Sequence, residues 1–486
     1  MLRLKECGYK AAPITDRASA FGWVRWSQLA KDNGLRPVFG VELAVTSSIN
    51  EKRPTSDYWT FIAQDRLRPI NQLIELATQQ FRYQPLLTYE QAQQPGVMRI
   101  VGHRSGLDLV DPHDDTYIGL GPSSSKGYIA KAMKAGHQLV AVSDNKYPRE
   151  GDQGFYEVVC GRNASSQSYS QHILTPKEWR ASIVKTAVPL SAANQAEKNA
   201  KAILKASTAD LVHAHLLVPE KPKTLRALCL AGAKKVGMDL KDPAYKKRLD
   251  YELKMIAEKE FEDYFFIVAD ICDFARGQMI VGPARGSSCG SLVCYALGIT
   301  AIDPIPYGLI FERFIDLNRG DLPDIDIDFS DQQRHLVFKY INQKYGKERC
   351  ARLGTVAMYK SRSAISESGA ALRVPKWKCD AVSESMIERS SGDSRALNTL
   401  EDTLITMPAG KDLIEEYPEM MVAAKMEGHP RHYSQHAAGI VIAENPITDI
   451  IPIDHRTGAT MCDKKDAEAL NLLKIDALGL TQLSVF

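Results

Sequence analysis

The stretch "LPDIDIDFS", residues 322–330, places three aspartates at alternate positions with isoleucine between them. Successive side chains of a strand point to opposite faces, so this alternation predicts a short strand. Asp324, Asp326 and Asp328 would share one face of it, while the apolar residues anchor the other face in a core. Like charges this close repel one another, and a divalent cation among them is the simplest means of stabilising the arrangement.

The composition is typical of an ordinary folded, soluble protein. A chain of 486 residues is long enough for about two to four domains. No apolar stretch is long enough to span a membrane, and the N-terminus lacks the apolar core of a signal peptide, so we expect a cytoplasmic protein with no membrane partner. The nine cysteines are scattered and form no C-x-x-C pair, which argues against a disulfide framework and a zinc site.

Hydrophobic periodicity changes along the chain. To about residue 190, short β-like runs alternate with polar helical stretches, as in an α/β layer or barrel. From roughly residue 194 to 280, apolar residues recur at three- and four-residue spacing, which predicts helices. Glycine density then rises sharply, and the candidate chemistry begins there.

A glycine- and serine-rich turn, "VGPARGSSCGSLVCYALGIT" (281–300), precedes the acidic stretch. The pattern predicts an apolar helix that begins near Ser287 or Ser288, either of which can cap it. Small residues let backbone N–H groups approach a phosphate, and Arg285 adds positive charge. The turn matches neither a Walker A loop nor a dinucleotide-binding turn. A tight helix entry without a ligand explains the same pattern equally well.

A glycine-serine turn followed by an acidic strand suits nucleotidyl transfer, in which carboxylates hold two Mg²⁺ ions. A further carboxylate, Asp476, lies in the apolar run "EALNLLKIDALGLTQLSVF", which predicts a buried strand. An unpaired carboxylate there is costly, so a metal or another cation is implied. Lys474 shares its face by two-residue spacing and is placed to contact a triphosphate. The alternative is a strand end at which both side chains are solvated.

The segment from Asp331 to Lys378 is strongly basic, with eleven lysines and arginines against three acidic residues. Such an excess favours an anionic partner. A solvated helical face is the alternative, and the segment by itself does not exclude it.

Together these motifs resemble the N-terminal half of a bacterial C-family DNA polymerase, the replicative polymerase III α subunit. The resemblance is carried by "VGPARGSSCGSLVCYALGIT", "FERF", "PDIDIDF", "HAAGIVIA" and "DKKDAEALNLLKIDALGL", in the family's order, over about residues 255 to 486. It implies an α/β and α+β multidomain fold: an incomplete PHP-like (polymerase and histidinol phosphatase) α/β barrel, then a Pol β-like nucleotidyltransferase palm with an inserted helical thumb. The implied segments are 1–190 (PHP-like), 191–355 (first part of the palm), 356–430 (thumb-like helices) and 431–486 (second part of the palm).

The resemblance also implies roles for individual residues. The catalytic, metal-binding carboxylates would be Asp324, Asp326 and Asp476, with Asp328 as a supporting member. The contacts to the triphosphate of the dNTP would be Arg285, Gly286, Ser287, Arg313 and Lys474. For Arg313, pairing with the neighbouring Glu312 is the alternative. The implied cofactor is a pair of Mg²⁺ ions, with Mn²⁺ left open.

The basic segment corresponds in the family to the palm exit and the start of the thumb. Lys360 and Arg362 lie near a family lysine, with the local spacing shifted by about a residue. They are the candidates for contacts to primer-template DNA through its phosphates, without reading its sequence.

The N-terminal part resembles the family's PHP domain, a metal-binding α/β barrel in its active members. Asp16, Glu42 and Asp144 are retained, while Arg17 and Lys146 occupy positions where metal-binding members often carry histidine. Cationic side chains there argue against a filled metal cluster. We therefore expect a truncated, metal-free PHP domain without proofreading activity.

Three further histidines invite functional interpretation. His436 in "HYSQHAAGIVIA" lies in a turn resembling the family's His-Ala-Gly-Gly, with Ala438 in place of the first glycine, and we expect it to be structural. His213 and His215 form an H-x-H without nearby acidic or cysteine partners, so we do not expect them to bind a metal.

The sequence thus predicts the catalytic, palm-containing part of a DNA-directed DNA polymerase that adds dNTPs to a primer 3′-hydroxyl. Because the family continues beyond the palm, we expect one half of a split or truncated polymerase. Its second chain would supply the fingers and C-terminal domains, and any contact to a sliding clamp would be made through that chain. The short, divergent N-terminal domain would also suit a viral or plasmid-borne relative, and a viral protein would act in the host cytoplasm. Two alternatives stay open: a noncatalytic DNA-binding or scaffold subunit that retains the palm fold, and a PHP-type phosphoesterase or exonuclease.

Overall fold

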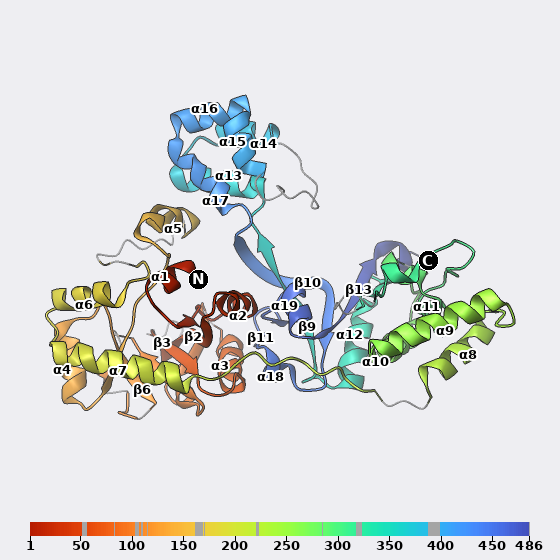
Figure 1. Ribbon diagram of the computed structural model, residues 1–486, viewed down its shortest axis with the longest axis horizontal. Coiled ribbons are helices and arrows are strands. Elements are labelled where there is room, and N and C mark those ends of the chain that lie inside the picture. Colours follow the sequence, from red (N-terminus) through yellow and green to blue (C-terminus); the bar gives the residue numbers. More distant parts are fainter. Residues whose placement is uncertain are drawn as a thin grey trace.

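The computed structural model describes residues 1–50, 56–81, 83–102, 106–107, 110–113, 115–160, 169, 171–219, 223–283, 285–316, 323–386 and 399–485. Figure 1 shows an N-terminal α/β unit, a second sheet beside it with helices on its far side, and a group of helices standing apart on two long strands. Within the described residues, no helix has both the length and the apolar character needed to cross a membrane.

The N-terminal unit is built on a seven-stranded, mixed sheet in the order β1-β2-β3-β5-β6-β7, with β4 paired to β2. Its strands are β1 (Ala11–Ile14), β2 (Arg36–Thr46), β3 (Ser56–Ala63), β4 (Leu86–Thr88), β5 (Val97–Val101), β6 (Thr116–Leu120) and β7 (Gln138–Ala141). Its helices are α1 (Leu2–Glu6), α2 (Trp23–Asp32), α3 (Arg68–Gln79), α4 (Lys126–Lys134), α5 (Gln153–Cys160), α6 (Pro176–Lys185) and α7 (Leu190–Ala206). The predicted alternation of β-like and helical runs is confirmed here.

The second sheet has six strands in the order β11-β12-β9-β10-β13-β8. The strands are β8 (Asp326–Ser330), β9 (Cys350–Met358), β10 (Pro430–Ile442), β11 (Ile453–Asp454), β12 (Ala459–Thr460) and β13 (Leu473–Leu480). The predicted acidic strand therefore exists, although it begins at Asp326, and Asp324 lies just before it. The predicted alternation is confirmed, because Ile325, Ile327 and Phe329 are buried between the half-buried aspartates.

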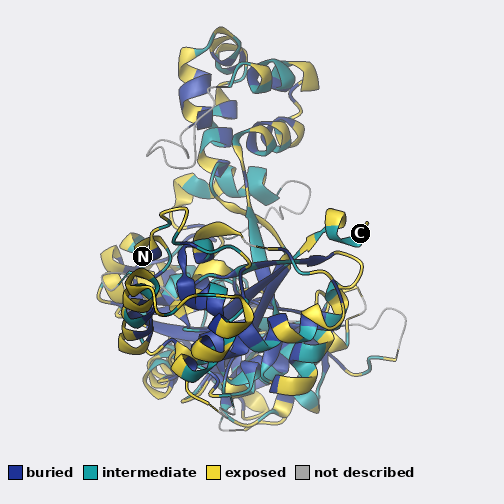
Figure 2. Cartoon of the chain, turned by 90° about the vertical axis from the view of Figure 1, so that its right-hand side faces the viewer, coloured by how far each residue is buried: buried dark blue, intermediate teal, exposed yellow. Residues whose placement is uncertain are grey.

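Each face of the second sheet packs on a different core. Side chains such as Ile440 and Ile475 belong to a hydrophobic cluster with the helices on the far side of the sheet. Val441 and Leu353, which point the opposite way, belong to a cluster that runs continuously into the N-terminal unit. Figure 2 shows buried residues concentrated in this shared lower body. The N-terminal unit and the second sheet are therefore joined through one apolar core.

Helices before and after β8 cover the far face of the second sheet. They are α8 (Leu225–Lys235), α9 (Pro243–Glu258), α10 (Glu262–Arg276), α11 (Leu292–Ala296) and α12 (Arg334–Tyr345). The helical periodicity runs without a break through residues 245–277, but the structure divides it into α9 and α10. Glu260 adopts a left-handed backbone conformation with φ 58°, which no helix can continue through. Two short helices, α18 (Ile447–Ile450) and α19 (Lys464–Ala469), lie between the later strands.

The described part of the chain between β9 and β10 holds five α-helices: α13 (Ser361–Leu372), α14 (Lys376–Glu384), α15 (Thr399–Thr406), α16 (Pro408–Glu416) and α17 (Val422–Met426). They stand at the top of Figure 1, on the paired ends of the two strands. Their own hydrophobic cluster includes Ile365, Leu404 and Met420, each fully buried. Partly buried residues of α5 pack against this cluster, so the group also touches the N-terminal unit.

Candidate functional site

The acidic residues converge where β8 and β13 run side by side. The two strands pair in parallel with Asp476 directly opposite Asp326, and Asp324 lies two residues earlier on the same chain segment. Ligand oxygens of Asp324, Asp326 and Asp476 all lie within 4.8 Å of one another. No other three His, Cys, Asp or Glu side chains in the described ranges meet this criterion. We call these three residues the acidic cluster.

Asp476 is the most buried member of the acidic cluster. Its neighbours Ile475 and Ala477 are fully buried on the opposite face of β13, and Asp476 itself is 7% exposed. Lys474 Nζ contacts its Oδ2 at 2.5 Å, but its Oδ1 has no hydrogen-bond partner among the described residues. An unsatisfied buried carboxylate oxygen carries a desolvation cost of about 1–3 kcal/mol or more.

Two lysines compensate part of the negative charge, and both contact Asp324. Lys474 Nζ lies 3.0 Å from Asp324 Oδ1, and Lys464 Nζ lies 2.7 Å from Asp324 Oδ2. The predicted sharing of a face by Lys474 and Asp476 is confirmed. No ion pair to Asp326 is found within the described part of the chain, so the compensation is uneven.

The electrostatics of the acidic cluster follow from these contacts. Burial raises the pKa of Asp324, but the hydrogen bond from Lys464 and the charge of Lys474 outweigh it, and the pKa lies below the ordinary value. Burial also raises the pKa of Asp326, and the charges of Asp324 and Asp476 raise it further, so this pKa lies above the ordinary value. The charges of Lys474 and Arg285 offset only part of this effect on Asp326.

The donor set of the acidic cluster fits a divalent cation. All three side chains offer oxygen, which is the ligand type preferred by Mg²⁺ and also accepted by Mn²⁺. The unpartnered Asp476 Oδ1 is an orphaned acceptor that such an ion would satisfy. Asp328 is not one of the three convergent residues, and its Oδ1 forms an ion pair with Arg285 Nη1 at 3.2 Å.

The glycine- and serine-rich turn lies directly against β8. The N–H of Gly282 donates to the carbonyl of Asp328 at 2.7 Å, and a Cβ at Gly282 would lie 2.7 Å from that residue's Cβ, so only glycine fits. Gly286 has φ 63°, and a Cβ there would lie 3.6 Å from Asp326 Oδ2. Arg285, Gly286 and Ser287 are all exposed beside the acidic cluster.

The predicted start of the apolar helix was wrong. Residues Gly286–Gly290 form a short 3-10 turn, and α11 begins only at Leu292, capped by the Ser291 hydroxyl. The buried carboxylate of Glu252 accepts the N–H groups of Leu292 and Val293 at 2.9 and 3.0 Å. The N-terminus of α11 is therefore already satisfied by the protein, and only the preceding turn is open to a phosphate.

The remaining predicted contacts lie on exposed surface. Arg313 is exposed, and the alternative pairing with Glu312 is not found, because Glu312 instead accepts the Tyr251 hydroxyl at 2.7 Å. Lys360 is the residue before α13, and Arg362 lies in its first turn; both are exposed. No described contact joins Arg313, Lys360 or Arg362 to the acidic cluster.

His436 shapes the backbone next to the acidic cluster. Its Nδ1 accepts the N–H groups of Gly439 at 2.8 Å and Ala438 at 3.3 Å, at an irregularity in the pairing of β10 with β9. Gly439 is paired with Asp476, and a Cβ on Gly439 would lie 2.9 Å from His436 Nδ1. These contacts agree with the structural role expected for His436.

The pair His213 and His215 lies in the segment between α7 and α8, which runs across the lower part of the second sheet in Figure 1. Both side chains are exposed. The segment is held by its backbone: the N–H of Ala214 donates to the carbonyl of Leu470, and the carbonyl of His215 accepts the N–H of Glu444. The two histidines belong to a backbone-anchored connection.

The carboxylates of the N-terminal unit are arranged differently. Arg17 Nε lies 2.5 Å from Glu42 Oε1, and Lys146 Nζ lies 2.8 Å from Asp144 Oδ1. Asp16 is exposed. Arg17 and Lys146 therefore pair with two of these three acids. We call Asp16, Glu42 and Asp144 the N-terminal acids.

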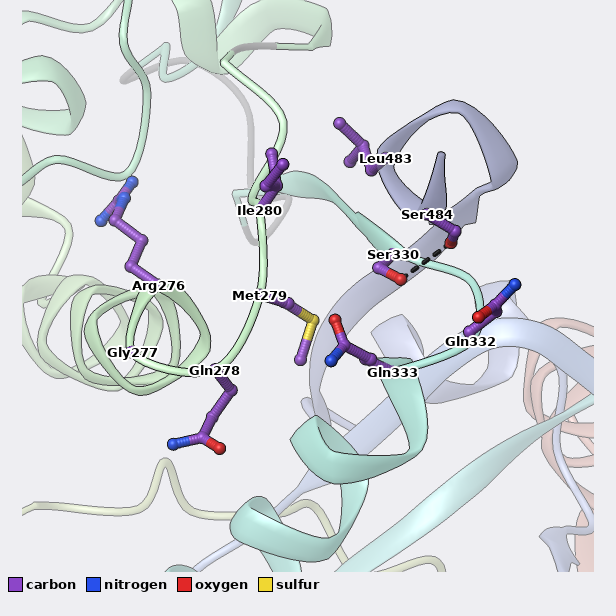
Figure 3. A pocket seen from close by; sticks show the side chains of 10 residues that line it. All are labelled: Arg276, Gly277, Gln278, Met279, Ile280, Ser330, Gln332, Gln333, Leu483 and Ser484. Atoms are coloured by element: carbon purple, nitrogen blue, oxygen red, sulfur yellow. Dashed lines mark hydrogen bonds between the residues drawn. The ribbon is translucent and has the colours of Figure 1, made fainter. Parts of the chain in front are cut away.

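A polar hollow of about 590 Å³ lies at the opposite end of β8 from the acidic cluster. Figure 3 shows that the chain after β13 reaches it, with Ser484 hydrogen-bonded to Ser330 at 2.8 Å. The hollow is lined by Arg276, Gly277, Gln278, Met279, Ile280, Ser330, Gln332, Gln333, Leu483 and Ser484. None of the predicted site residues lines it.

Sequence reasoning missed Lys464 and Glu252. Lys464 lies in "DKKDAEA", where Asp463 and Asp466 form a reciprocal cap at the start of α19. That capping pattern was available as a signal for the helix start. The contact of Lys464 with Asp324, 140 residues away, had no sequence signal.

Known proteins are similar to this chain over the region that holds the acidic cluster. Residues 223–479, more than half of the chain, match the family described as "Bacterial DNA polymerase III alpha NTPase domain". The chain is similar to an error-prone DNA polymerase of Alkalilimnicola ehrlichii, with 31% identity over 99% of this chain and 49% of the relative. It is also similar to the DNA polymerase III subunit alpha of Staphylococcus aureus, with 28% identity over 98% of this chain and 44% of the relative.

A third relative, the DNA polymerase III subunit alpha of Thermus aquaticus, is 39% identical over 48% of this chain and 20% of its own length. The chain thus spans about half the length of the two relatives that it matches throughout. The family match covers β8, β13, the glycine- and serine-rich turn and the inserted helices. The chain belongs to the bacterial DNA polymerase III alpha family.

Proposed function

We propose that this chain carries the nucleotidyl-transfer centre of a DNA-directed DNA polymerase. The observation that carries the proposal is the pairing of β13 with β8, which brings Asp476 to Asp324 and Asp326 and leaves Asp476 Oδ1 without a partner. Membership of the polymerase III alpha family supports DNA as the template and dNTPs as the substrates.

In this proposal Asp324, Asp326 and Asp476 hold two Mg²⁺ ions, with Mn²⁺ as the alternative, and Asp328 supports them. Bound ions would increase the acidity of the primer 3′-hydroxyl and offset the charge of the in-line displacement. The chain itself supplies the fixed carboxylates. Because β8 and β13 are hydrogen-bonded neighbours with a buried opposite face, these carboxylates are held on a rigid support.

The proposed triphosphate contacts surround the acidic cluster. Gly286 and Ser287 offer exposed backbone next to Asp326, and Arg285 extends from the same turn. Lys474 is 7% exposed and contacts two of the carboxylates, so its charge acts on a group that enters the acidic cluster. Arg313 would reach the phosphates from η6 (Phe311–Arg313).

We further propose that Lys360 and Arg362 bind primer-template DNA through its phosphates. Both are exposed at the point where β9 passes into the inserted helices, which would act as the thumb. We expect the fingers, and any contact to a sliding clamp, to come from a second polymerase chain or region, with the complex acting in the cytoplasm.

A second candidate is a noncatalytic DNA-binding or scaffold subunit. The observation that favours it is the double pairing of Asp324 with Lys464 and Lys474, which already compensates one member of the acidic cluster. A scaffold would retain the fold and DNA binding without using the carboxylates. A phosphoesterase in the N-terminal unit is disfavoured by the ion pairs of its acids.

Primer extension decides between the first two candidates. The chain, purified from its source with whatever co-purifies, is compared with its Asp324→Asn/Asp326→Asn variant on a primed DNA template with Mg²⁺. We expect synthesis to fall at least about 100-fold, because two metal-binding carboxylates are lost. Asp331→Asn is the matched control, since this exposed residue lies just after β8 and bonds to Thr481 and Ser484 instead. Unchanged synthesis in the double variant would refute the proposal.

A further inference from the structure

Helix α19 connects the N-terminal unit to the acidic cluster. Asp463 and Asp466 cap its start reciprocally, and Arg25 of α2 in the N-terminal unit forms ion pairs with both acids. Lys464 lies between these acids in sequence and points its Nζ to Asp324 Oδ2 at 2.7 Å. One helical turn therefore binds the N-terminal unit on one side and the acidic cluster on the other.

The core explains why α19 holds this position. Ala467 is fully buried in the hydrophobic cluster shared by the N-terminal unit and the second sheet. Asp476 and Lys474 point toward the same side of the sheet, since they pair with Gly439 and Val441, and Val441 belongs to that cluster. The acidic cluster thus opens on the face of the sheet against which α19 packs.

The two lysines on Asp324 differ in how easily they can move. The Lys474 side chain is 8% exposed and is also bound to Asp476, so it is fixed within the site. The Lys464 side chain is 49% exposed, and Asp324 is its close partner. The half-exposed ammonium of Lys464 therefore binds Asp324 more weakly than that of Lys474 does, and it can rotate into solvent.

We propose that Lys464 is a positioning residue that holds Asp324 within the acidic cluster and yields its place to a divalent cation, and that Arg25 sets its position through α19. The inference rests on the proposed function only in that the acidic cluster binds such a cation. Because the ammonium and the cation compete for the same carboxylate oxygen, Lys464 lowers the cation affinity of the free site.

Cation affinity tests this competition without any measurement of synthesis. Mn²⁺ is titrated calorimetrically into the whole chain and into its Lys464→Met variant. Loss of an exposed ion pair should tighten Mn²⁺ binding about three- to fivefold. Lys465→Met is the matched control. Lys465 is the next residue in the chain and is exposed, so its substitution removes the same charge without breaking a contact to the acidic cluster. We expect it to change affinity less than about twofold.

The direction of the change separates competition from structural damage. A merely structural Lys464 would give weaker Mn²⁺ binding in Lys464→Met, and weaker or equal binding would overturn the proposal. Lys464→Arg keeps the charge and should bind Mn²⁺ as the unaltered chain does. If Asp326→Asn leaves all Mn²⁺ binding unchanged, the cation site itself is absent, which would refute the proposed function rather than the role of Lys464.

A double-variant cycle tests the contribution of Arg25. Arg25→Met frees the start of α19 and should tighten Mn²⁺ binding about twofold in the unaltered chain, because Lys464 is then held less firmly. The same substitution in the Lys464→Met background should have no effect. Equal effects of Arg25→Met in both backgrounds would show that Arg25 does not act through Lys464.

Discussion

The chain contains two sets of three acids and two cations, and they differ in how the charges are distributed. Among the N-terminal acids, Glu42 forms an ion pair with Arg17 and Asp144 forms one with Lys146, while Asp16 lies at the exposed surface. In the acidic cluster, Lys464 and Lys474 both form ion pairs with Asp324, and Lys474 also contacts Asp476.

The comparison shows that formal charge does not by itself make a cation site. The two sets have the same numbers of acids and cations, but only the oxygens of the acidic cluster converge within 4.8 Å in the described part of the chain. Burial raises the pKa of Asp326, and the charges of the two neighbouring carboxylates raise it further. An external cation relieves that repulsion, whereas the paired N-terminal acids gain little from one.

The largest expected effect comes from removing the buried acid of the acidic cluster. Asp476→Asn should weaken Mn²⁺ binding at least about tenfold, because one of three convergent carboxylates loses its charge. Asp144→Asn removes the same charge from the N-terminal acids and should leave Mn²⁺ affinity unchanged. Calorimetric titration of both variants measures the difference. A comparable loss in Asp144→Asn would contradict the distinction between the two sets.

Removing the two cations that pair with the N-terminal acids should leave the charge of these acids uncompensated, as part of the charge of the acidic cluster is. Arg17→Met/Lys146→Met breaks both ion pairs and the stacking of Arg17 on the Tyr58 ring, 3.8 Å from its centroid. We expect the midpoint of thermal unfolding to fall by about 2 °C. Added Mn²⁺ should restore part of this loss in the variant.

The matched control for that experiment is Lys31→Met, which breaks the exposed ion pair with Asp210 in the same unit. It should lower the midpoint by less than about 1 °C and show no added response to Mn²⁺. If the double variant behaves like this control, the two cations are ordinary surface partners and do not compensate the N-terminal acids.

The smallest expected effect is a gain in stability from neutralising Asp326. Its pKa in the folded chain is raised above that of the unfolded chain, so the charged carboxylate costs folding free energy above the folded-state pKa. Without divalent cations, Asp326→Asn should raise the unfolding midpoint at pH 7.5 by about 1 °C.

The pH dependence of this gain checks its cause. As pH falls through the raised pKa of Asp326, the unaltered chain also becomes neutral there, so the gain should shrink and vanish below the unfolded-state pKa. Thermal unfolding of both proteins in EDTA, at pH 7.5 and at a pH below the unfolded-state pKa of Asp326, measures the gain in the unfolding midpoint. A lower midpoint for Asp326→Asn at pH 7.5 would show that the carboxylate stabilises the fold.

Local sequence patterns predicted which residues of the central strands are buried. The alternation in 322–330 predicted which side chains of β8 are buried, and the apolar run around Asp476 predicted the buried strand β13. Such periodicity is local information, because it depends only on which face of an element meets a core. This local information made Asp324, Asp326, Asp328, Asp476 and Lys474 candidates alike, and only the family resemblance selected Asp324, Asp326 and Asp476 among the acids.

The tertiary structure decided what those residues meet. The start of α11 depends on Glu252, and the break before α10 depends on the left-handed conformation of Glu260. The parallel register of β8 with β13 and the approach of Lys464 to Asp324 join segments about 140 to 150 residues apart. Long-range register is set by how two cores pack against the faces of one sheet, and no local pattern encodes it.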